Sequence, residues 1–233
     1  MTRQEATPTP RVPLNRDRVL RAAVALADAT GIDALSMRRL AQELDVVPMA
    51  LYKHVANKEE LLDGMADAVV GEIDPPAAGP DWRSVVRGRI LSARRVLLRH
   101  PWAARVIESR TGPTPAVLAY LDSMAGTFRA GGLSADLTHH VMHAMGSRLL
   151  GFSQELFDTS GPSDSSDSSG PPDPGLAARY PHIAELAATA AHDGGSTVGG
   201  GCDDQFEFEF ALDLLLDGFE NLRRRGWTSA RTP

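Results

Sequence analysis

The apolar residues of this chain recur at intervals of three and four over most of its length, which is the period of an α-helix. Asn15 is suited to cap a first helix that ends near Gly31, and Ser36 is suited to cap a second. Pro48, a favoured residue in a first helical turn, is expected to begin a very short third helix. No segment alternates convincingly in the manner of a β-strand. The pattern therefore predicts an all-α fold.

A fourth helix is expected after Asn57, because Glu60 three positions later completes the pattern of a capping box. The proline pair at 75–76 ends this helix. Between later helices, residues 159–175 are rich in Ser, Asp, Pro and Gly, and we expect a disordered loop there, with a second flexible loop at 193–201. The later segments with helical period are residues 82–100, 101–109, 114–130, 134–157, 176–192 and 203–225.

Composition narrows the class of protein. The chain has 233 residues, 42% of them hydrophobic, which allows a packed core. The net charge of −6 argues at first against nucleic acid, but the first 60 residues carry nine basic and eight acidic side chains, so the negative charge lies beyond them. A single cysteine, Cys202, fits a reducing cytosol, and we expect a cytoplasmic protein. The polar, proline-rich residues 1–13 predict a disordered tail, and no apolar run is long enough for a membrane span.

Residues 36–55, SMRRLAQELDVVPMALYKHV, have the layout of a helix-turn-helix. Two helices that cross closely need a small residue, which Ala41 supplies, and the turn needs a residue that tolerates a left-handed backbone, where Asp45 stands in place of the easier glycine. Leu51 and Val55 can lock the crossing from the second helix. An ordinary helical hairpin is the alternative, and Ala41 and Leu51 alone do not exclude it.

The polar residues around the short third helix favour DNA. Tyr52, Lys53, His54 and Lys58 can all donate hydrogen bonds to phosphate oxygens. Lys58 stands in the first turn of the fourth helix, where the helix dipole disfavours a cation, and a bound phosphate would remove that conflict. For Lys58 taken by itself, a solvated surface charge is an equally good reading.

The run PMALYKHVANKEELLD, from Pro48 to Asp63, resembles the most specific signature of the TetR family, and the resemblance extends from Asn15 to Asp74. It continues more loosely into a C-terminal domain similar to the tetracycline-repressor branch. The resemblance implies phosphate contacts by Tyr52, His54 and Lys58, with Lys53 in either role. It implies that the major groove is faced by Ser36, Arg38, Pro48, Met49 and Ala50. Val47 departs from the family by replacing the usual Ser-like cap of the recognition helix.

These observations predict two functional parts. Residues 14–74 form a DNA-binding domain of three helices, with the helix-turn-helix motif at 36–55. Its fourth helix links it to a helical-bundle domain, residues 75–233, which binds a ligand and dimerises. The resemblance implies a repressor that binds a palindromic operator as a homodimer and that a small organic effector releases. A helical protein-interaction module without DNA binding, or an enzyme on a helical scaffold, is the alternative.

The terminal helix carries two apolar stripes, which calls for two neighbours. One neighbour is its own domain, and the other is a partner chain, unless the helix is the central core helix of a monomer. We expect the partner helices to pair as a four-helix bundle. The residues expected to dimerise are Met142, Met145, Leu149, Phe208, Leu212, Leu215, Phe219 and Leu222.

The effector is not expected to be a metal–tetracycline complex, because the tetracycline repressor's metal-facing histidines correspond to Asp74 and Ile107 here. A mostly apolar pocket with few polar groups suits a lipophilic organic ligand. His139, His140 and His143 lack the glutamate of the catalytic zinc motif, so no metal or cofactor is expected. Nor is there a nucleophile elbow or a phosphate loop, and we expect no enzyme. The residues expected to line the effector pocket are Ile90, Ala93, Leu97, Phe128, His143, Ser147, Phe152 and Glu155.

Overall fold

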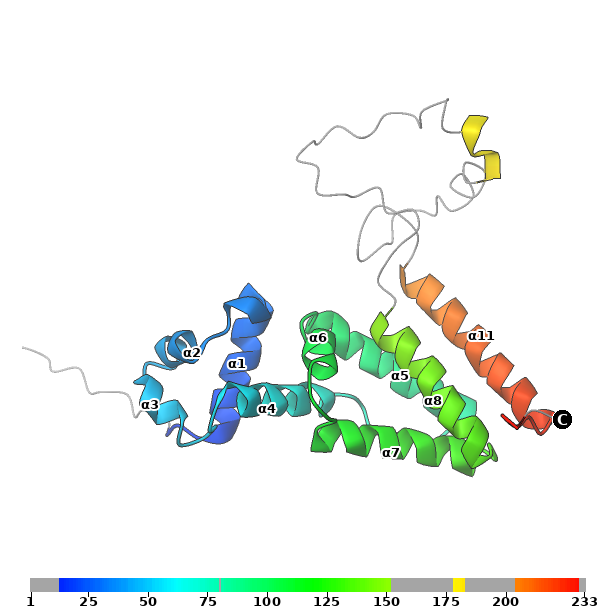
Figure 1. Cartoon of the computed structure of the whole chain (residues 1–233), viewed down its shortest axis with the longest axis horizontal. Coiled ribbons are helices and arrows are strands. Elements are labelled where there is room, and N and C mark those ends of the chain that lie inside the picture. The colour runs from blue at the N-terminus through cyan, green and yellow to red at the C-terminus, as the bar shows by residue number, and fades with distance from the viewer. Residues whose placement is uncertain (1–12, 80, 152–177, 183–203, 231–233) are drawn as a thin grey trace, which may run out of the picture. The chain divides into compact units, whose positions relative to one another are not determined.

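The computed structural model describes residues 13–79, 81–151, 178–182 and 204–230, without the side chains of residues 147–151 and 204. Every regular element in these ranges is helical, which confirms the all-α prediction (Figure 1). The elements are α1 (Arg16–Thr30), η1 (Ile32–Ala34), α2 (Met37–Glu43), α3 (Pro48–Leu51), α4 (Lys58–Val70), α5 (Trp82–Arg99), α6 (Ala103–Glu108), α7 (Pro115–Ala130), α8 (Ala135–Gly151) and α11 (Asp204–Arg224).

Four predictions concern segments that lie wholly or mostly outside the described residues. They are the disordered tail at 1–13, the loops at 159–175 and 193–201, and the helix expected at 176–192. Within the described ranges, no helix is long and apolar enough to cross a membrane.

Side-chain caps begin three helices of the N-terminal part, α1, α2 and α4. The Asn15 and Asn57 side chains accept backbone N–H groups at the starts of α1 and α4, both at 2.8 Å, and the Ser36 hydroxyl accepts one at the start of α2 at 3.2 Å. Glu60 reaches back to the N–H of Ala56, at 2.7 Å, and not to that of Asn57. The capping box of α4 is therefore shifted by one residue from the usual reciprocal pair.

The chain divides into two compact units, which meet in sequence at Gly131 and Gly132. This division does not fall at the domain boundary expected near residue 75. The reason is that α4 packs against α6 and α7 as well as against α1, so the DNA-binding helices and α5–α7 share one unit. The functional boundary near residue 75 stays a prediction.

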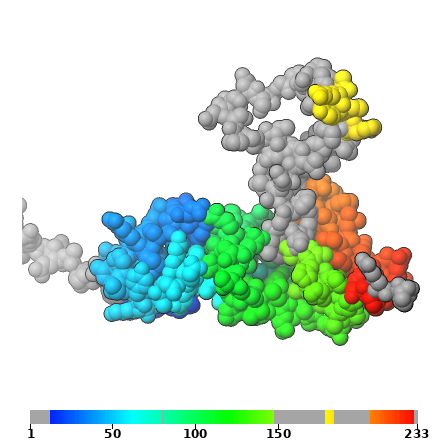
Figure 2. Space-filling view, in the orientation of Figure 1, coloured from blue at the N-terminus to red at the C-terminus, as the bar shows by residue number. Residues whose placement is uncertain are grey.

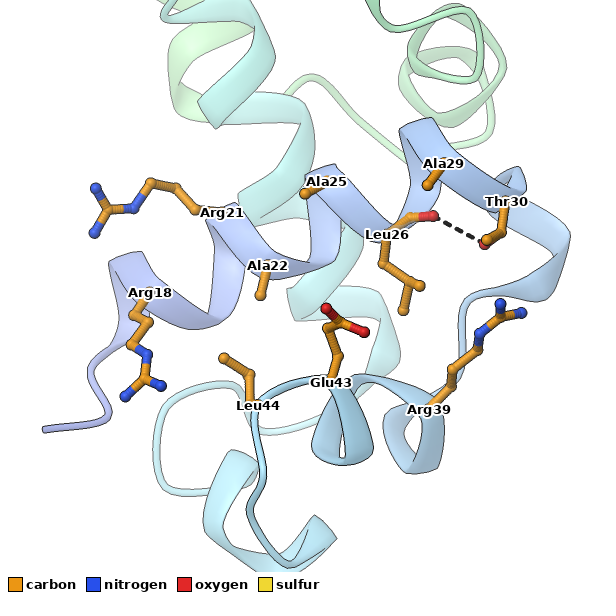
Figure 3. A pocket seen from close by; sticks show the side chains of 10 residues that line it. All are labelled: Arg18, Arg21, Ala22, Ala25, Leu26, Ala29, Thr30, Arg39, Glu43 and Leu44. Atoms are coloured by element: carbon orange, nitrogen blue, oxygen red, sulfur yellow. Dashed lines mark hydrogen bonds between the residues drawn. The ribbon is translucent and has the colours of Figure 1, made fainter. Parts of the chain in front are cut away.

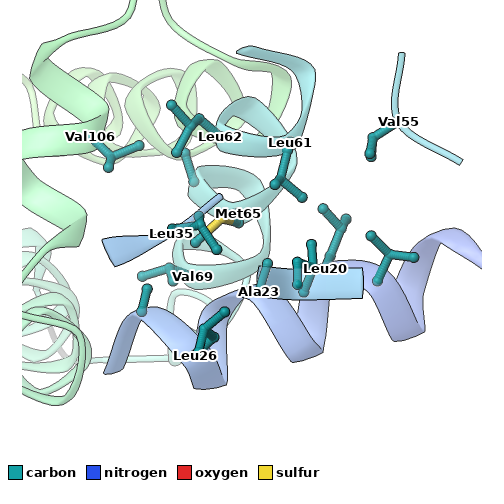
Figure 4. Close-up of a cluster of buried hydrophobic side chains, with 14 of the residues drawn as sticks. Leu20, Ala23, Leu26, Leu35, Val55, Leu61, Leu62, Met65, Val69 and Val106 are labelled. Atoms are coloured by element: carbon teal, nitrogen blue, oxygen red, sulfur yellow. The ribbon is translucent and has the colours of Figure 1, made fainter. Parts of the chain in front are cut away.

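One hydrophobic core runs through the first unit. Leu20, Ala23 and Leu26 of α1 point toward α4, where Leu61 and Met65 meet them (Figure 4). The same cluster takes in apolar side chains of α5 and α6, and in the space-filling view the blue and cyan surface of the first helices runs into the green surface of the later ones (Figure 2). The contributors from α5 and α6 and the turn before α6 are Val96, Trp102, Ala103 and Val106.

The second unit contains α8 and α11, which pack against each other. The end of the chain is held to the start of α8, because the Ser229 N–H and hydroxyl donate to the two carboxylate oxygens of Asp136, at 2.6 and 2.7 Å. These bonds from Ser229 lower the pKa of Asp136. The buried apolar residues of the unit include Leu137, Val141, Met145, Phe208, Leu212, Leu216 and Phe219.

This burial bears on the expected dimerisation face of α11, which stays a prediction. Phe208, Leu212 and Phe219 are at most 7% exposed within the single chain, so they have no surface left for a partner. Met145 of α8 is buried in the same way, whereas Leu215, Leu222 and Met142 are half-buried and the Leu149 side chain is outside the described residues. The exposed apolar stripe of α11 is the other one, formed by Phe206, Phe210 and Leu214.

Candidate nucleic-acid interface

The α2–turn–α3 segment has the packing that a helix-turn-helix requires. Ala41 is 0% exposed on α2, and Leu51 is 0% exposed on α3, so the two helices approach closely over apolar contacts. Asp45 lies in the turn with a φ of 52°, which makes it the one non-glycine residue of left-handed backbone in the described chain. The predicted left-handed backbone at Asp45 is confirmed. The packing fixes α3 against α2 and leaves its other face open to solvent.

The outer face of α3 is unusually apolar for a surface. Val47 and Met49 are 69% and 71% exposed, and Tyr52 is 45% exposed. Pro48 and Lys53 are exposed as well, while Ala50 and His54 are half-buried. Residues that project from a rigid helix in this way can reach base edges and thymine methyl groups in a major groove.

The remaining predicted DNA contacts flank this face. Ser36 and Arg38 are exposed at the start of α2, and the Ser36 hydroxyl is already engaged as the helix cap. Lys58 is the first residue of α4 and is exposed, with Glu59 and Glu60 next in the chain. The predicted DNA contacts thus all lie in or next to α2, α3 and the start of α4. The individual base and phosphate contacts stay predictions.

Salt bridges and hydrogen bonds tie α4 to the segment after α6 and to the start of α7. Arg110, which follows α6 and has a 10% exposed side chain, donates to Glu59 at 2.7 Å and to Asp63 at 3.3 Å. Burial would lower the pKa of Arg110, but the two carboxylates raise it above its ordinary value. The carboxylate of Asp67 accepts the backbone N–H of Ala116 at the start of α7, at 3.0 Å.

The segment after α4 is tied to α5 in the same manner. The Glu72 carboxylate accepts a hydrogen bond from the Arg99 guanidinium at 2.6 Å. The Asp74 carboxylate accepts hydrogen bonds from the Ser92 hydroxyl and the Arg95 guanidinium, both at 2.8 Å. Burial opposes ionisation of Glu72, yet the bonds from Arg99 and from the neighbouring histidine lower its pKa. Because of these bonds, a movement of α5, α6 or α7 would also move α4 or the segment that follows it.

A fourth connection joins α1 to the corner between α5 and α6. His100 is 7% exposed, with Nδ1 2.8 Å from the Asp28 carboxylate and Nε2 3.3 Å from that of Glu72. The indole N–H of Trp102 donates to the same Asp28 oxygen, at 2.7 Å. We call Asp28, His100 and Trp102 the α1 latch. No local pattern indicates it, because Asp28 lies 72 residues before His100 and 74 before Trp102.

Comparison with known proteins identifies the family. Residues 19–65 match the model for bacterial regulatory proteins of the tetR family, and residues 75–223 match the tetracyclin repressor-like C-terminal domain. The chain belongs to the TetR family. It is therefore a transcriptional regulator, whose first matched segment ends at residue 65 and whose second begins at residue 75.

Three relatives show the range of similarity within the TetR family. The transcriptional repressor DrrR1 of Streptomyces coeruleorubidus is 33% identical over 234 residues, covering 93% of this chain and 82% of that one. A transcriptional regulator of Saccharopolyspora erythraea is 40% identical over 120 residues, about half of each chain at 51%. The crystal structure of ActR from Streptomyces coelicolor with (S)-DNPA has a TM-score of 0.64 at 28% identity, covering 89% of this chain and 98% of that one.

The predicted effector residues of this TetR-family chain differ from one another in exposure and in their neighbours. Ile90, Ala93 and Phe128 are at most 3% exposed, and His143 is exposed on α8, with its ring 4.7 Å from that of His139. Leu97 packs against the core that contains α1 and α4. The Ser147, Phe152 and Glu155 side chains lie outside the described residues. Among described side chains, no three His, Cys, Asp or Glu residues come together as metal ligands.

An open groove of about 750 Å³ lies between α1 and α2. Its walls carry Arg18, Arg21, Arg39 and Glu43 around an apolar floor that includes Leu26, as Figure 3 shows. None of the predicted effector residues lines this groove, so it is separate from the proposed effector site.

The missing cap of α3 supplies a stability prediction. Val47 precedes Pro48 and makes no side-chain cap bond, so Val47→Ser is expected to raise the free energy of unfolding by about 0.5–1 kcal/mol. Ser36→Ala, which removes a real cap, is the reciprocal control and is expected to lower it by about 1 kcal/mol. Urea unfolding measures both; a fall for both variants would show that Val47 has another structural role.

Proposed function

We propose that two copies of this chain bind a palindromic DNA operator, repress transcription, and release the operator when a small organic effector binds. The observation that carries the proposal is the exposed face of α3, with Met49 71% exposed, beside a lysine at the start of α4. Two such faces related by two-fold symmetry would read two half-sites, with centres about one or more helical turns apart, roughly 34 Å per turn.

The contacts along α4 support a route from effector to DNA. Glu59, Asp63 and Asp67 tie α4 to α6 and α7, while Glu72 and Asp74 tie the following segment to α5. An effector that favours a different arrangement of α5–α7 would therefore shift α4 and, through it, α3. The linkage requires only that the effector bind the two arrangements with different affinity.

Pairing of two chains is proposed through the outward face of α11, where Phe206, Phe210 and Leu214 are 54–60% exposed. The rings of Phe206 and Phe210 stack at a centroid separation of 6.4 Å, so they present one continuous apolar surface. Together with α8, this face would build the expected four-helix bundle. An apolar stripe on a helix calls for a neighbour, and a second copy supplies one by symmetry.

The proposed effector is an organic molecule and not a metal–tetracycline complex. The Asp74 carboxylate is already used by Ser92 and Arg95, and Ile107 packs against the core of the first unit. Neither residue is arranged to hold a metal ion. We propose no enzymatic activity, and we place the protein in the bacterial cytoplasm, where its operator lies.

Lys58→Ala and Arg38→Ala test the proposal by acting differently. Lys58→Ala removes one proposed phosphate contact per chain, so it should weaken binding to every duplex by a similar factor. It should also reduce the slope of log affinity against log salt concentration by about 0.9 per chain. Arg38→Ala should relax sequence preference and cost about 1–3 kcal/mol on the preferred duplex if it reads a guanine. Fluorescence anisotropy at several salt concentrations measures both. If neither change affects DNA affinity, the interaction-module alternative is favoured.

A further inference from the structure

Arg89 of α5 is a buried cation that pairs with no anion among the residues that the structure describes. It is 7% exposed, in helical register with the buried Val86 and Ala93. Its NH1 donates to the Ser123 hydroxyl at 2.5 Å, and its Nε is buried without a hydrogen-bond partner. Buried arginines are ordinarily paired with carboxylates, because an uncompensated charge in a protein interior is costly. No carboxylate of the described residues contacts Arg89, so this part of the chain leaves its charge uncompensated.

A second unsatisfied polar group lies beside it. The Arg89 guanidinium sits 4.7 Å from the centre of the Tyr120 ring on α7, and the Tyr120 hydroxyl is buried without a hydrogen-bond partner. Burial raises the pKa of Tyr120 to about 12, although the charge of Arg89 acts to lower it. The hydroxyl is therefore a neutral donor at any physiological pH. Arg89 and Tyr120, whose side chains are in contact across α5 and α7, thus each carry a buried donor without an acceptor.

The surroundings of this pair are apolar. Met124 and Phe128 follow Tyr120 at helical spacing on α7 and are at most 2% exposed, and Ile90 is 3% exposed next to Arg89 on α5. The Phe128 ring lies 5.5 Å from that of Trp82, on the same pair of helices. In such an environment an ion pair is stronger than in water, and an unpaired polar group is correspondingly costly. The region suits a ligand that is mostly apolar with one anionic group.

We propose that the effector of this regulator is an organic acid, whose carboxylate pairs with Arg89 and accepts a hydrogen bond from Tyr120. The inference rests on the proposed function, in which an effector binds this regulator, and assigns the effector's chemistry from the contact between α5 and α7. Arg89 was not among the residues expected to bind the effector. The signal was present in the sequence, because an arginine in phase with Val86 and Ala93 falls on the buried face of its helix.

Matched acid and amide probes test the ligand chemistry. Calorimetry on the full chain would compare naphthalene-2-carboxylate with naphthalene-2-carboxamide, and anthraquinone-2-carboxylate with its amide. The wild-type protein should prefer each acid about tenfold or more, because charge-assisted hydrogen bonds to a buried guanidinium are strong. Arg89→Met should abolish the preference, and Tyr120→Phe should reduce it. Arg129→Met, a change at an exposed arginine of α7, is the matched control and should keep it.

Thermal unfolding separates a ligand-binding arginine from a structural one. Replacing an uncompensated buried charge by an apolar side chain of similar length should leave the unfolding midpoint of Arg89→Met unchanged or raised. A lowered midpoint with an unchanged preference for acids overturns the proposal, and so does a wild-type protein that binds no acid in preference to its amide at millimolar concentration. If the acids bind through Arg89 but no duplex is bound, the proposed function fails and this inference stands. If a duplex is bound but no acid is preferred to its amide, this inference fails and the proposed DNA binding stands.

Discussion

Phe210→Arg is expected to convert the dimer into a monomer and to weaken operator binding by about 10²–10⁴-fold. Phe210 is 54% exposed at the middle of the apolar stripe on α11, between Phe206 and Leu214. In a two-fold interface the change would bring two like charges together and remove two aromatic side chains, each of which contributes about 1.5–3 kcal/mol when buried. A monomer reads one half-site and loses the advantage of linked binding, which sets the size of the effect.

Sedimentation measures the oligomeric state, and anisotropy measures operator affinity. Leu118→Arg is the matched control, because Leu118 is 52% exposed on α7, outside the stripe, and its replacement should leave the dimer intact. Phe208, buried at 5% exposure inside the chain, should behave differently from both, since Phe208→Ala lowers the free energy of unfolding by about 3–5 kcal/mol. A Phe210→Arg variant that stays dimeric at micromolar concentration would place the interface elsewhere.

Asp28→Ala is expected to lower the free energy of unfolding by about 2–4 kcal/mol. The substitution leaves the indole N–H of Trp102 and Nδ1 of His100 without their shared acceptor, and both residues are 7% exposed. A buried donor that loses its partner costs about 1–3 kcal/mol. Because the α1 latch joins α1 to the α5–α6 corner, we also expect weaker transmission of the effector signal to DNA.

Asp33→Ala offers a close comparison. Asp33 also bonds an arginine of α6, Arg105, but the two side chains are 86% and 63% exposed. Exposed pairs of this kind contribute about 0–1 kcal/mol, so the control should change stability little. Urea unfolding and effector-dependent release of DNA are the two measurements. Equal destabilisation by both substitutions would show that burial does not distinguish the α1 latch from a surface ion pair.

The elements of this fold were predictable because their signals are local. Asn15, Ser36 and Asn57 cap helices within three residues of themselves, and Asp45 marks a turn that needs a left-handed backbone. Pro48 begins α3 as expected. In each case a residue type and a short spacing are sufficient, since the interaction closes within one helical turn.

The site was less predictable where it depends on contacts between distant residues. Both stripes of α11 are equally apolar in the sequence, and only packing against α8 shows that the stripe with Leu212 is internal and the stripe with Phe210 is external. The ties between α4 and Arg110, or between Asp28 and His100, join residues 47 to 72 positions apart. A hydrophobic period identifies a buried face but does not say which neighbour covers it.

The most direct test of the account is selection from random duplex DNA with the purified full chain. We expect an enriched palindrome whose half-site centres lie about one or more helical turns apart, each half read by one α3. The wild-type protein and Lys58→Ala should enrich the same sequence, because Lys58 is proposed to contact phosphate. Enrichment of an asymmetric single half-site, or of no sequence at all, would contradict the central claim that this chain is a dimeric, operator-specific regulator.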